Sequence, residues 1–310
     1  MIKVRQVLLC SAVPFFFLAA SCVRENSSRK QDIHVQQMSG FPNQEFGYEL
    51  GVSACYAGII GNKLVMAGGC NFAGKSAAEG GPKYFYKGIY TAEITKDSVL
   101  VWKQVGKLPS PVAYGVSISR SGEMILIGGN NADGGLTSVF RLKLAEDGGA
   151  ILDTLPALPF AQDNMSGAAS GNTIYVAGGN RNGSPSTSML SLNLNEPELG
   201  WKEEVPFPGA ARVQPVCAVQ DGMLYLWGGF CPSQNGGEAS VATDGYRYLP
   251  LQEQWEPVPA PAVAETGEPL TLTGGTSCVW SDSIILCTGG VDKDIFLDAI
   301  SGDYKRIAKE

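Results

Sequence analysis

Five short apolar runs in this chain each end in a pair of glycines, and this repeat limits the fold more than any other feature of the sequence. The runs are LVMAGG (64–69), MILIGG (124–129), IYVAGG (174–179), LYLWGG (224–229) and ILCTGG (285–290). Their first glycines are 60, 50, 50 and 61 residues apart. A near-constant spacing of this size predicts a series of similar supersecondary units packed side by side.

The residues around each glycine pair predict four antiparallel strands. The run SACYAGII (53–60) precedes a polar turn at Gly61 and Asn62, and LVMAGG returns, which indicates a hairpin. Third stretches follow at 88–94, 138–144 and 188–194, and fourth stretches run into a proline at 101–109, 151–159, 200–208 and 254–261. Four such strands form one blade of a kelch-type propeller. Trp102, Trp201 and Trp255 recur in the fourth stretch, where aromatic rings fill the gap between blades.

The two ends of the sequence are expected to hold incomplete blades. Four complete blades begin near residues 53, 113, 165 and 213, whereas the fifth shows only TSCVWS and SIILCTGG. Residues 32–42 resemble an outer strand followed by a proline turn. About one and a half further blades, roughly 75 residues at this period, would join the two ends in a six-bladed propeller. We therefore expect an all-β, kelch-type β-propeller over residues 49–310 with four complete blades and parts of two others.

The first 22 residues have the layout of a secretory signal. Lys3 and Arg5 precede an apolar run, and the segment Ala19-Ala20-Ser21-Cys22 resembles the lipobox of bacterial lipoproteins. We expect residues 1–21 to be a signal peptide, Cys22 to carry lipid, and residues 22–48 to form a tether and the terminal outer strand. The apolar run is shorter than the roughly 20 residues of a spanning helix. The expected protein is an exported bacterial lipoprotein, periplasmic or attached to the outer membrane, that meets the membrane only through its anchor.

Charge and cysteine content restrict the partners. The net charge of −7 argues against a nucleic-acid partner, because phosphate binding needs clustered positive charge. Outside the signal and lipobox the cysteines are Cys55, Cys70, Cys217, Cys231, Cys278 and Cys287. Disulfides are open to an exported chain, but most of these residues lie in apolar strand patterns, which favours buried free thiols. Their spacing contains no CxxC pair, so a zinc site is not expected. No cofactor is expected either.

Two motifs are weak signals of catalysis. Residues 69–76 (GCNFAGKS) match the letters of a phosphate-binding loop, but the following AAEGGPKYFY is unsuited to the helix that such a loop must open. We interpret the match as fortuitous. His34 is the only histidine, which argues against Ser-His-Asp, Cys-His and two-histidine metal sites.

The topology of a propeller indicates where a ligand would bind. Connections from strand two to three, and from strand four to the next strand one, lie on one face around the mouth of the central channel. The substrate-binding candidates there are Asn71, Glu79, Lys83, Tyr114, Arg181 and Arg212, with Lys75, Asn131 and Glu238 in the same loops. Amides and carboxylates can bind sugar hydroxyls, and Arg or Lys can bind a carboxylate, so the mixture suits a sugar acid. For each residue the alternative is an ordinary surface-loop position.

Four segments resemble the cyclically permuted mutarotases, relatives of N-acetylneuraminate epimerase. They are residues 51–94 and 113–131, WGGF (227–230) and CTGGVDKDIF (287–296). AAEGG (77–81) is the most specific part, and the resemblance covers roughly residues 41–300. It implies a six-bladed, exported isomerase that interconverts the α and β anomers of N-acetylneuraminic acid. The implied ligand is a small sugar acid, and a homodimer is one possible assembly.

The same family places its proposed catalytic Glu and Arg in a Gly-Glu-x-Lys-Pro-Gly-x-Arg loop of the sixth blade. The nearest match here, residues 237–244, lacks both the Lys-Pro-Gly and the Arg. The catalytic residues are therefore unknown. The resemblance implies a truncated member, and whether this form is active stays open. Two alternatives stay open, a non-catalytic propeller that binds carbohydrate or protein and a purely structural interaction module, because the fold alone does not choose among functions.

Overall fold

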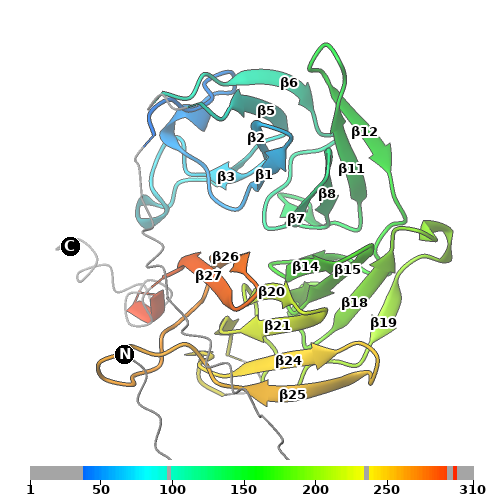
Figure 1. Ribbon diagram of the computed structural model, residues 1–310. Helices are drawn as coiled ribbons and strands as arrows, with labels where there is room; N and C mark the ends of the chain where they lie inside the picture. The colour runs from blue at the N-terminus through cyan, green and yellow to red at the C-terminus, as the bar shows by residue number, and fades with distance from the viewer. Residues whose placement is uncertain (1–37, 96–98, 234–236, 292–295, 299–310) are drawn as a thin grey trace, which may run out of the picture. The chain divides into compact units, whose positions relative to one another are not determined.

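The computed structural model describes residues 38–95, 99–233, 237–291 and 296–298, so Cys22 and His34 lie outside the described residues. The fold is a kelch-type β-propeller, as predicted. Four four-stranded antiparallel sheets, blades 1 to 4, follow one another along the chain, and a two-stranded sheet comes after them (Figure 1). In each blade the strands pair in chain order from the innermost to the outermost.

Blade 1 consists of β1 (Tyr56–Ile60), β2 (Lys63–Ala67), β5 (Gly88–Glu93) and β6 (Lys103–Lys107). Blade 2 consists of β7 (Val116–Arg120), β8 (Glu123–Ile127), β11 (Val139–Leu144) and β12 (Ala150–Thr154). Blade 3 consists of β14 (Ser166–Ser170), β15 (Thr173–Ala177), β18 (Met189–Asn193) and β19 (Lys202–Glu204). Blade 4 consists of β20 (Val216–Gln220), β21 (Met223–Trp227), β24 (Gly245–Leu249) and β25 (Gln254–Val258). The two-stranded sheet, hereafter hairpin 5, consists of β26 (Gly275–Ser281) and β27 (Ile284–Gly289).

Short elements fill the connections after the glycine pairs, except β13, which lies between β12 and β14. They are β3 (Cys70–Asn71) with β4 (Tyr84–Phe85), β9 (Asn130–Asn131) with β10 (Gly134–Gly135), β13 (Gln162–Asp163) with β16 (Asn180–Arg181) and β17 (Ser184–Pro185), and β22 (Phe230–Cys231) with β23 (Ser240–Val241). The 3-10 turns are η1 (Tyr48–Leu50), η2 (Ala77–Glu79) and η3 (Pro197–Leu199). Within the described residues, no helix has the length and apolar character needed to cross a membrane.

The glycine pairs end the second strand of each blade for a steric reason. Gly68 has φ 65° and Gly69 has φ 98°, a region that side chains with a Cβ rarely adopt. A Cβ at Gly68 would also collide with the carbonyl oxygen of Val112, which lies in the connection to the next blade. The glycines therefore let one blade's turn pack directly against the backbone that leads into the next.

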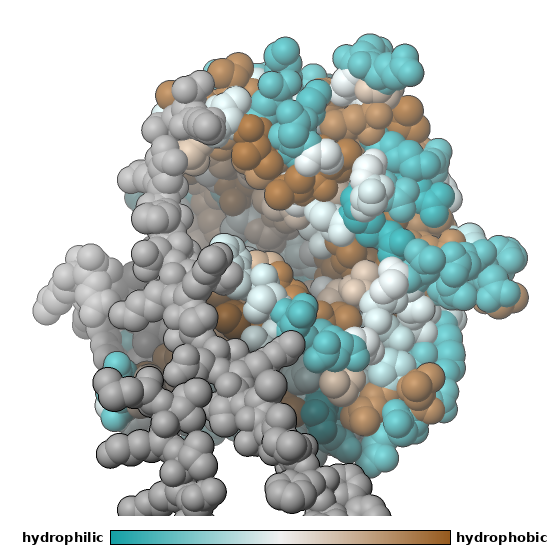
Figure 2. Space-filling view, in the orientation of Figure 1, coloured by the Kyte–Doolittle hydropathy of each residue, from teal (hydrophilic) through white to brown (hydrophobic). Residues whose placement is uncertain are grey.

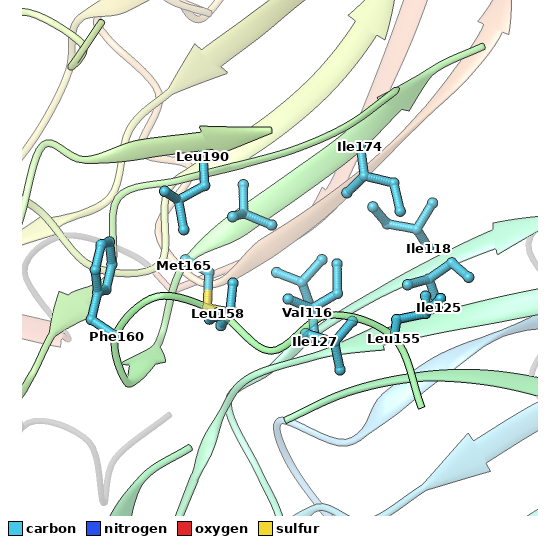
Figure 3. Packing of buried hydrophobic residues seen from close by; sticks show 12 residues of the cluster. Val116, Ile118, Ile125, Ile127, Leu155, Leu158, Phe160, Met165, Ile174 and Leu190 are labelled. Carbon is cyan, nitrogen blue, oxygen red and sulfur yellow. The ribbon is translucent and has the colours of Figure 1, made fainter. Parts of the chain in front are cut away.

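The hydrophobic core lies between consecutive blades. Figure 3 shows Val116 and Ile127 of blade 2 facing Ile174 and Leu190 of blade 3, and all four side chains are buried. Similar clusters join blades 1 and 2, blades 3 and 4, and blade 4 with hairpin 5. Each fully buried side chain of this kind contributes about 1.5–3 kcal/mol. A blade is therefore stabilised mainly by the blades on either side of it.

The tryptophans of the outer stretches link neighbouring blades, as predicted. The indole N–H of Trp201 donates to the Pro156 carbonyl beyond β12 at 2.8 Å, and that of Trp255 donates to the Val205 carbonyl beyond β19 at 2.8 Å. Trp102, just before β6, donates to the Gly40 carbonyl at 3.2 Å. Gly40 therefore accepts the hydrogen bond that Pro156 and Val205, just past the outer strands of blades 2 and 3, accept from the tryptophans of blades 3 and 4. Ser39 forms a bridge with Val99, and residues 32–37 of the predicted terminal outer strand lie outside the described residues.

Candidate functional site

A chain of backbone hydrogen bonds crosses the blades where the inner strands begin. A residue just ahead of each inner strand has a left-handed backbone. These residues are Ala54, Tyr114, Asn164, Gln214 and Gly274, with φ between 52° and 71°. From Tyr114 onward, the N–H of each of the other four donates to the carbonyl of the corresponding residue in the preceding blade, at 2.9, 2.8, 2.6 and 3.0 Å along the series. We call these five residues the inner belt. It places one side chain per blade around the start of the inner strands.

The belt holds residues that do not favour this conformation. Left-handed backbone is uncommon for tyrosine and glutamine, and such strain costs on the order of 1–3 kcal/mol per residue. Here it is held in place because Tyr114 and Gln214 are hydrogen-bonded through the backbone on both sides. Strain of this kind concentrates at functional sites, so the belt marks a candidate site.

The inner strands enclose a cavity of about 510 Å³. Figure 2 shows the surface hollowed between the inner strands of blades 1 and 2 and those that follow. All five belt residues line the cavity, together with small residues of the inner strands such as Gly115, Gly167 and Gly275. A volume of this size is in the range of small-molecule sites, about 300–1,000 Å³.

Serine hydroxyls in the cavity wall serve the structure. Ser117 Oγ donates to the Ala57 carbonyl at 2.8 Å, which joins blades 2 and 1. Ser277 Oγ donates to the Cys217 carbonyl at 2.6 Å, and Cys217 N donates to Ser166 Oγ at 3.1 Å. These bonds tie the inner strands together across the blades.

A lysine and a tyrosine meet at one side of the mouth. Lys83 Nζ, from the connection before β4, donates to the hydroxyl oxygen of Tyr114 at 2.9 Å and lies 4.9 Å from the centre of that ring and 5.7 Å from that of Phe72. Partial burial disfavours the charged form of Lys83, but the bond to Tyr114 outweighs it and raises the lysine pKa. Burial also raises the pKa of Tyr114. At neutral pH the pair is therefore an ammonium beside a protonated phenol.

Three polar side chains form a line that begins next to Tyr114 along the belt. Asp163 Oδ1 accepts from Asn164 Nδ2 at 2.5 Å and from Asn180 Nδ2 at 2.8 Å. Asn164 Oδ1 accepts from Gln214 Nε2 at 2.8 Å. Asp163 is only 5% exposed, whereas Asn164 and Gln214 reach the cavity. The line connects a buried carboxylate of blade 3 with a cavity-lining amide of blade 4.

Comparison with known families identifies the chain. The family model described as N-acetylneuraminate epimerase matches residues 18–151 and 155–310. The chain belongs to the N-acetylneuraminate epimerase family. Proteins named N-acetylneuraminate epimerase are similar over 143 residues, with 35% identity in Haemophilus influenzae (strain PittEE) and 34% in Salmonella arizonae. These alignments cover 46% of this chain and 35% of each relative, so in them the chain spans about a third of the relatives' length.

A solved structure shares the fold. "Structure of YjhT" superposes with a TM-score of 0.61, covers 77% of both chains and is 13% identical in sequence. At this identity the likeness supports the propeller architecture alone. It agrees with the blades described above for this member of the N-acetylneuraminate epimerase family.

The structure places both candidate arginines in ion pairs. Arg212 is only 1% exposed, and its guanidinium binds the Asp244 carboxylate and the Ala210 carbonyl. Arg181 forms an ion pair with Glu203 at 3.1 Å and stacks on the Phe160 ring at 3.8 Å. Neither lines the cavity, since each is held by a carboxylate of its own blade. Among the described candidates, Lys83 and Tyr114 are the two that the fold brings together at the mouth.

Two other candidates have structural roles. Asn71 Nδ2 donates to the Gly47 and Gly51 carbonyls at 2.7 Å each, and its Oδ1 accepts from Tyr86 at 2.8 Å, so the whole amide is engaged. Glu79 accepts from the Ser76 hydroxyl at 2.7 Å and its N–H at 3.1 Å, and these bonds lower its pKa. The phosphate-loop match at residues 69–76 is followed directly by the 3-10 turn η2 and not by an α-helix, so this segment does not form a phosphate loop.

The six described cysteines are all free thiols, as the apolar patterns favoured. Cys55 and Cys217 line the cavity, and burial raises their pKa values to about 11 and about 12. Both thiols are therefore protonated at neutral pH and act as small apolar groups. Sequence reasoning did not single out Asp163, Asn164 or Gln214, although Tyr114, Asn164 and Gln214 recur 50 residues apart and could have been found by aligning the repeats.

Proposed function

We propose that this chain binds N-acetylneuraminate at the mouth of the central cavity and interconverts its α and β anomers. Family membership supports the substrate and the reaction, and the cavity supports a ligand of this size. The observation that carries the proposal is the placement of Lys83. Within the described residues its ammonium has no carboxylate partner, and it lies against Tyr114, which lines the cavity.

The chemistry assigns a role to each member of this pair. Lys83 would bind the sugar carboxylate and so fix the orientation of the ring. Tyr114, held protonated by burial, would donate to the ring oxygen while water in the open cavity takes the proton of the anomeric hydroxyl. The ring opens, the carbonyl carbon turns its other face, and reversal of the proton transfers closes the other anomer. No net proton or electron is consumed.

A second function, sugar-acid binding without catalysis, is favoured by one observation. Both candidate arginines are bound to carboxylates, so neither is left unpaired to stabilise charge on a reacting sugar. The two functions share the Lys83 site and differ only in turnover, so one set of measurements separates them.

The test uses Lys83→Gln with Lys87→Gln as a matched control on the exposed side of the same connection. We expect Lys83→Gln to weaken N-acetylneuraminate binding about tenfold or more, because a charge-assisted hydrogen bond is lost, and to leave thermal stability near that of the wild type. Calorimetry measures binding, and NMR exchange between the anomers measures turnover. Equal affinity in the wild type and Lys83→Gln would overturn the role of Lys83.

The remaining outcomes assign the class of protein. Binding together with anomer exchange faster than in buffer supports the mutarotase. Binding without faster exchange supports the non-catalytic alternative. If the protein shows neither binding nor faster exchange, the result supports a structural interaction module.

We also propose that the protein is exported and anchored by lipid at Cys22, on the basis of its lipobox-like segment. Cys22→Ser should move the protein from the membrane fraction to the soluble fraction, whereas Cys10→Ser should not. Retention of Cys22→Ser in the membrane fraction would contradict the anchor.

A further inference from the structure

We infer that the line from Asp163 through Asn164 to Gln214 holds the Gln214 amide in one orientation and makes its oxygen a hydrogen-bond acceptor for the ligand. The ligand must then present a donor, a hydroxyl or an amide N–H, at that side of the mouth. This inference rests on the proposed sugar-acid site. It assigns recognition to Gln214 and a positioning role to Asp163.

The direction of the line follows from the donors and acceptors available. Asp163 Oδ1 accepts hydrogen bonds from the side-chain amide nitrogens of Asn164 and Asn180. A carboxylate oxygen can only accept, so an amide oxygen in either place would face another acceptor. Asn164 must therefore turn its nitrogen to Asp163 and its oxygen to Gln214. Gln214 in turn must present Nε2 to Asn164, and Oε1 is left as its outer atom.

The position of Gln214 Oε1 leaves it available. Within the described residues this oxygen has no hydrogen-bond partner, and the Gln214 side chain lines the cavity and is partly exposed. A Cβ built on Gly274 would lie 3.1 Å from Oε1, so the glycine keeps the space beside the oxygen clear. The acceptor faces space on the hairpin 5 side of the mouth.

Burial makes the orientation costly to reverse. Asp163 is nearly fully enclosed, and turning Asn164 around would leave its carboxylate with one amide donor in place of two. A buried acceptor that loses a partner costs about 1–3 kcal/mol. The backbone bond from Gln214 N to Asn164 O at 2.6 Å fixes the distance between the two amides. The line is thus set by the fold before a ligand arrives.

The mouth then has two chemically different sides. Lys83 and Tyr114 offer donors, and Gln214, two positions further along the belt, offers an oriented acceptor. A sugar acid that carries both a carboxylate and an N–H or hydroxyl donor satisfies both sides. A ligand with acceptors at both places would leave Gln214 Oε1 facing another acceptor and would be rejected.

The first experiment reads the orientation without a ligand. Side-chain amide NMR of the purified chain should show slow solvent exchange at Gln214 Nε2, and Asp163→Asn should speed that exchange about tenfold, because Asn164 is then free to turn. Asp153→Asn, on the exposed outer strand β12, is the control and should change nothing. Fast exchange at Gln214 in the wild type, or no response to Asp163→Asn, would overturn the inference.

The second experiment adds N-acetylneuraminate. Gln214→Met keeps the approximate size of the side chain but removes the acceptor, and it should weaken binding about tenfold, whereas the exposed Gln252→Met should not. Undiminished binding by Gln214→Met would overturn the recognition role. Failure of the wild type to bind N-acetylneuraminate would contradict the proposed function. The ligand-free exchange data would still report the orientation of Gln214, so failure of the proposed function can be told from failure of this inference.

Discussion

Blade 3 and hairpin 5 begin from nearly the same sequence pattern and reach different environments. Ile174 in IYVAGG is fully buried, whereas Ile285, at the same place in ILCTGG, is only partly buried. The inner strand of blade 3 lies between β7 and β20, whereas β26 packs against β20. The repeat therefore determines the strand and its turn, and the neighbouring blade determines whether the strand is buried.

The difference appears again at the surface of hairpin 5. Val279, Trp280 and Ile284 are 46%, 45% and 43% exposed, values unlike those of blade interiors. Blade 1 carries a matching feature at the other end of the series, an apolar cavity of about 390 Å³ lined by Ile59, Met66 and Trp102 among others. Each middle blade buries its apolar faces against the blades on both sides. The first and last described sheets keep part of such a face exposed.

The largest expected effect is on stability. Leu190→Ala, in the cluster between blades 2 and 3, should lower the free energy of unfolding by about 3 kcal/mol, because it leaves a cavity in a closed interface. Ile285→Ala should cost about 1 kcal/mol, because its neighbours are partly solvated already. Urea unfolding followed by fluorescence measures both. Equal losses would break the comparison between the two regions.

Much of this contrast could be predicted from the sequence. The glycine pairs located β2, β8, β15, β21 and β27, and the turn at Gly61 and Asn62 is the one observed. The two strands of hairpin 5 were also expected, because TSCVWS and SIILCTGG predict them. These features depend on local pattern and on steric limits at glycine, both of which are visible in one dimension.

The site was harder to predict because it depends on pairing across the chain. Nothing near Arg212 in the sequence shows that Asp244, 32 residues later, binds it, and Glu203 is 22 residues from Arg181. A surface loop and a buried ion pair therefore look alike in the sequence. Lys83 and Tyr114, 31 residues apart, were singled out for their types and loops, and their contact came only from the fold.

A smaller effect should follow from the ion pair that steadies the turn beside hairpin 5. Arg212 also donates to the Gly228 carbonyl at 3.3 Å, and Gly228 packs closely against Leu272, which leads into the hairpin. Asp244→Asn should destabilise the protein by about 2 kcal/mol, because it leaves the buried guanidinium without its counter-charge. Hydrogen exchange should quicken in β26 and β27 and stay unchanged in β14 and β15. Uniform loss of protection would show that the turn does not support the hairpin selectively.

The same pair predicts a pH dependence. Partial burial opposes ionisation of Asp244, but the bonds from Arg212 outweigh it and hold the pKa of that carboxyl below its usual range. Its contribution to stability is therefore complete above the ordinary aspartate pKa of about 3.9 and is lost as the pH falls through the lowered value. Asp244→Asn should lack this part of the acid dependence, which urea midpoints at pH 6 and in mild acid would measure.

The smallest effect concerns chemistry at the thiols and leaves stability untouched. Cys217 on β20 is buried, which raises its pKa to about 12, whereas Cys278 on the adjacent β26 is exposed. A thiol-specific reagent at neutral pH should label Cys278 first and Cys217 only on unfolding, because reaction requires both access and a thiolate. Mass spectrometry after timed labelling distinguishes the two, and Cys278→Ser should abolish the fast phase. If Cys217 reacted as fast as Cys278, strand β20 would be as open as β26, and blade 4 would belong with the exposed region rather than with the buried one.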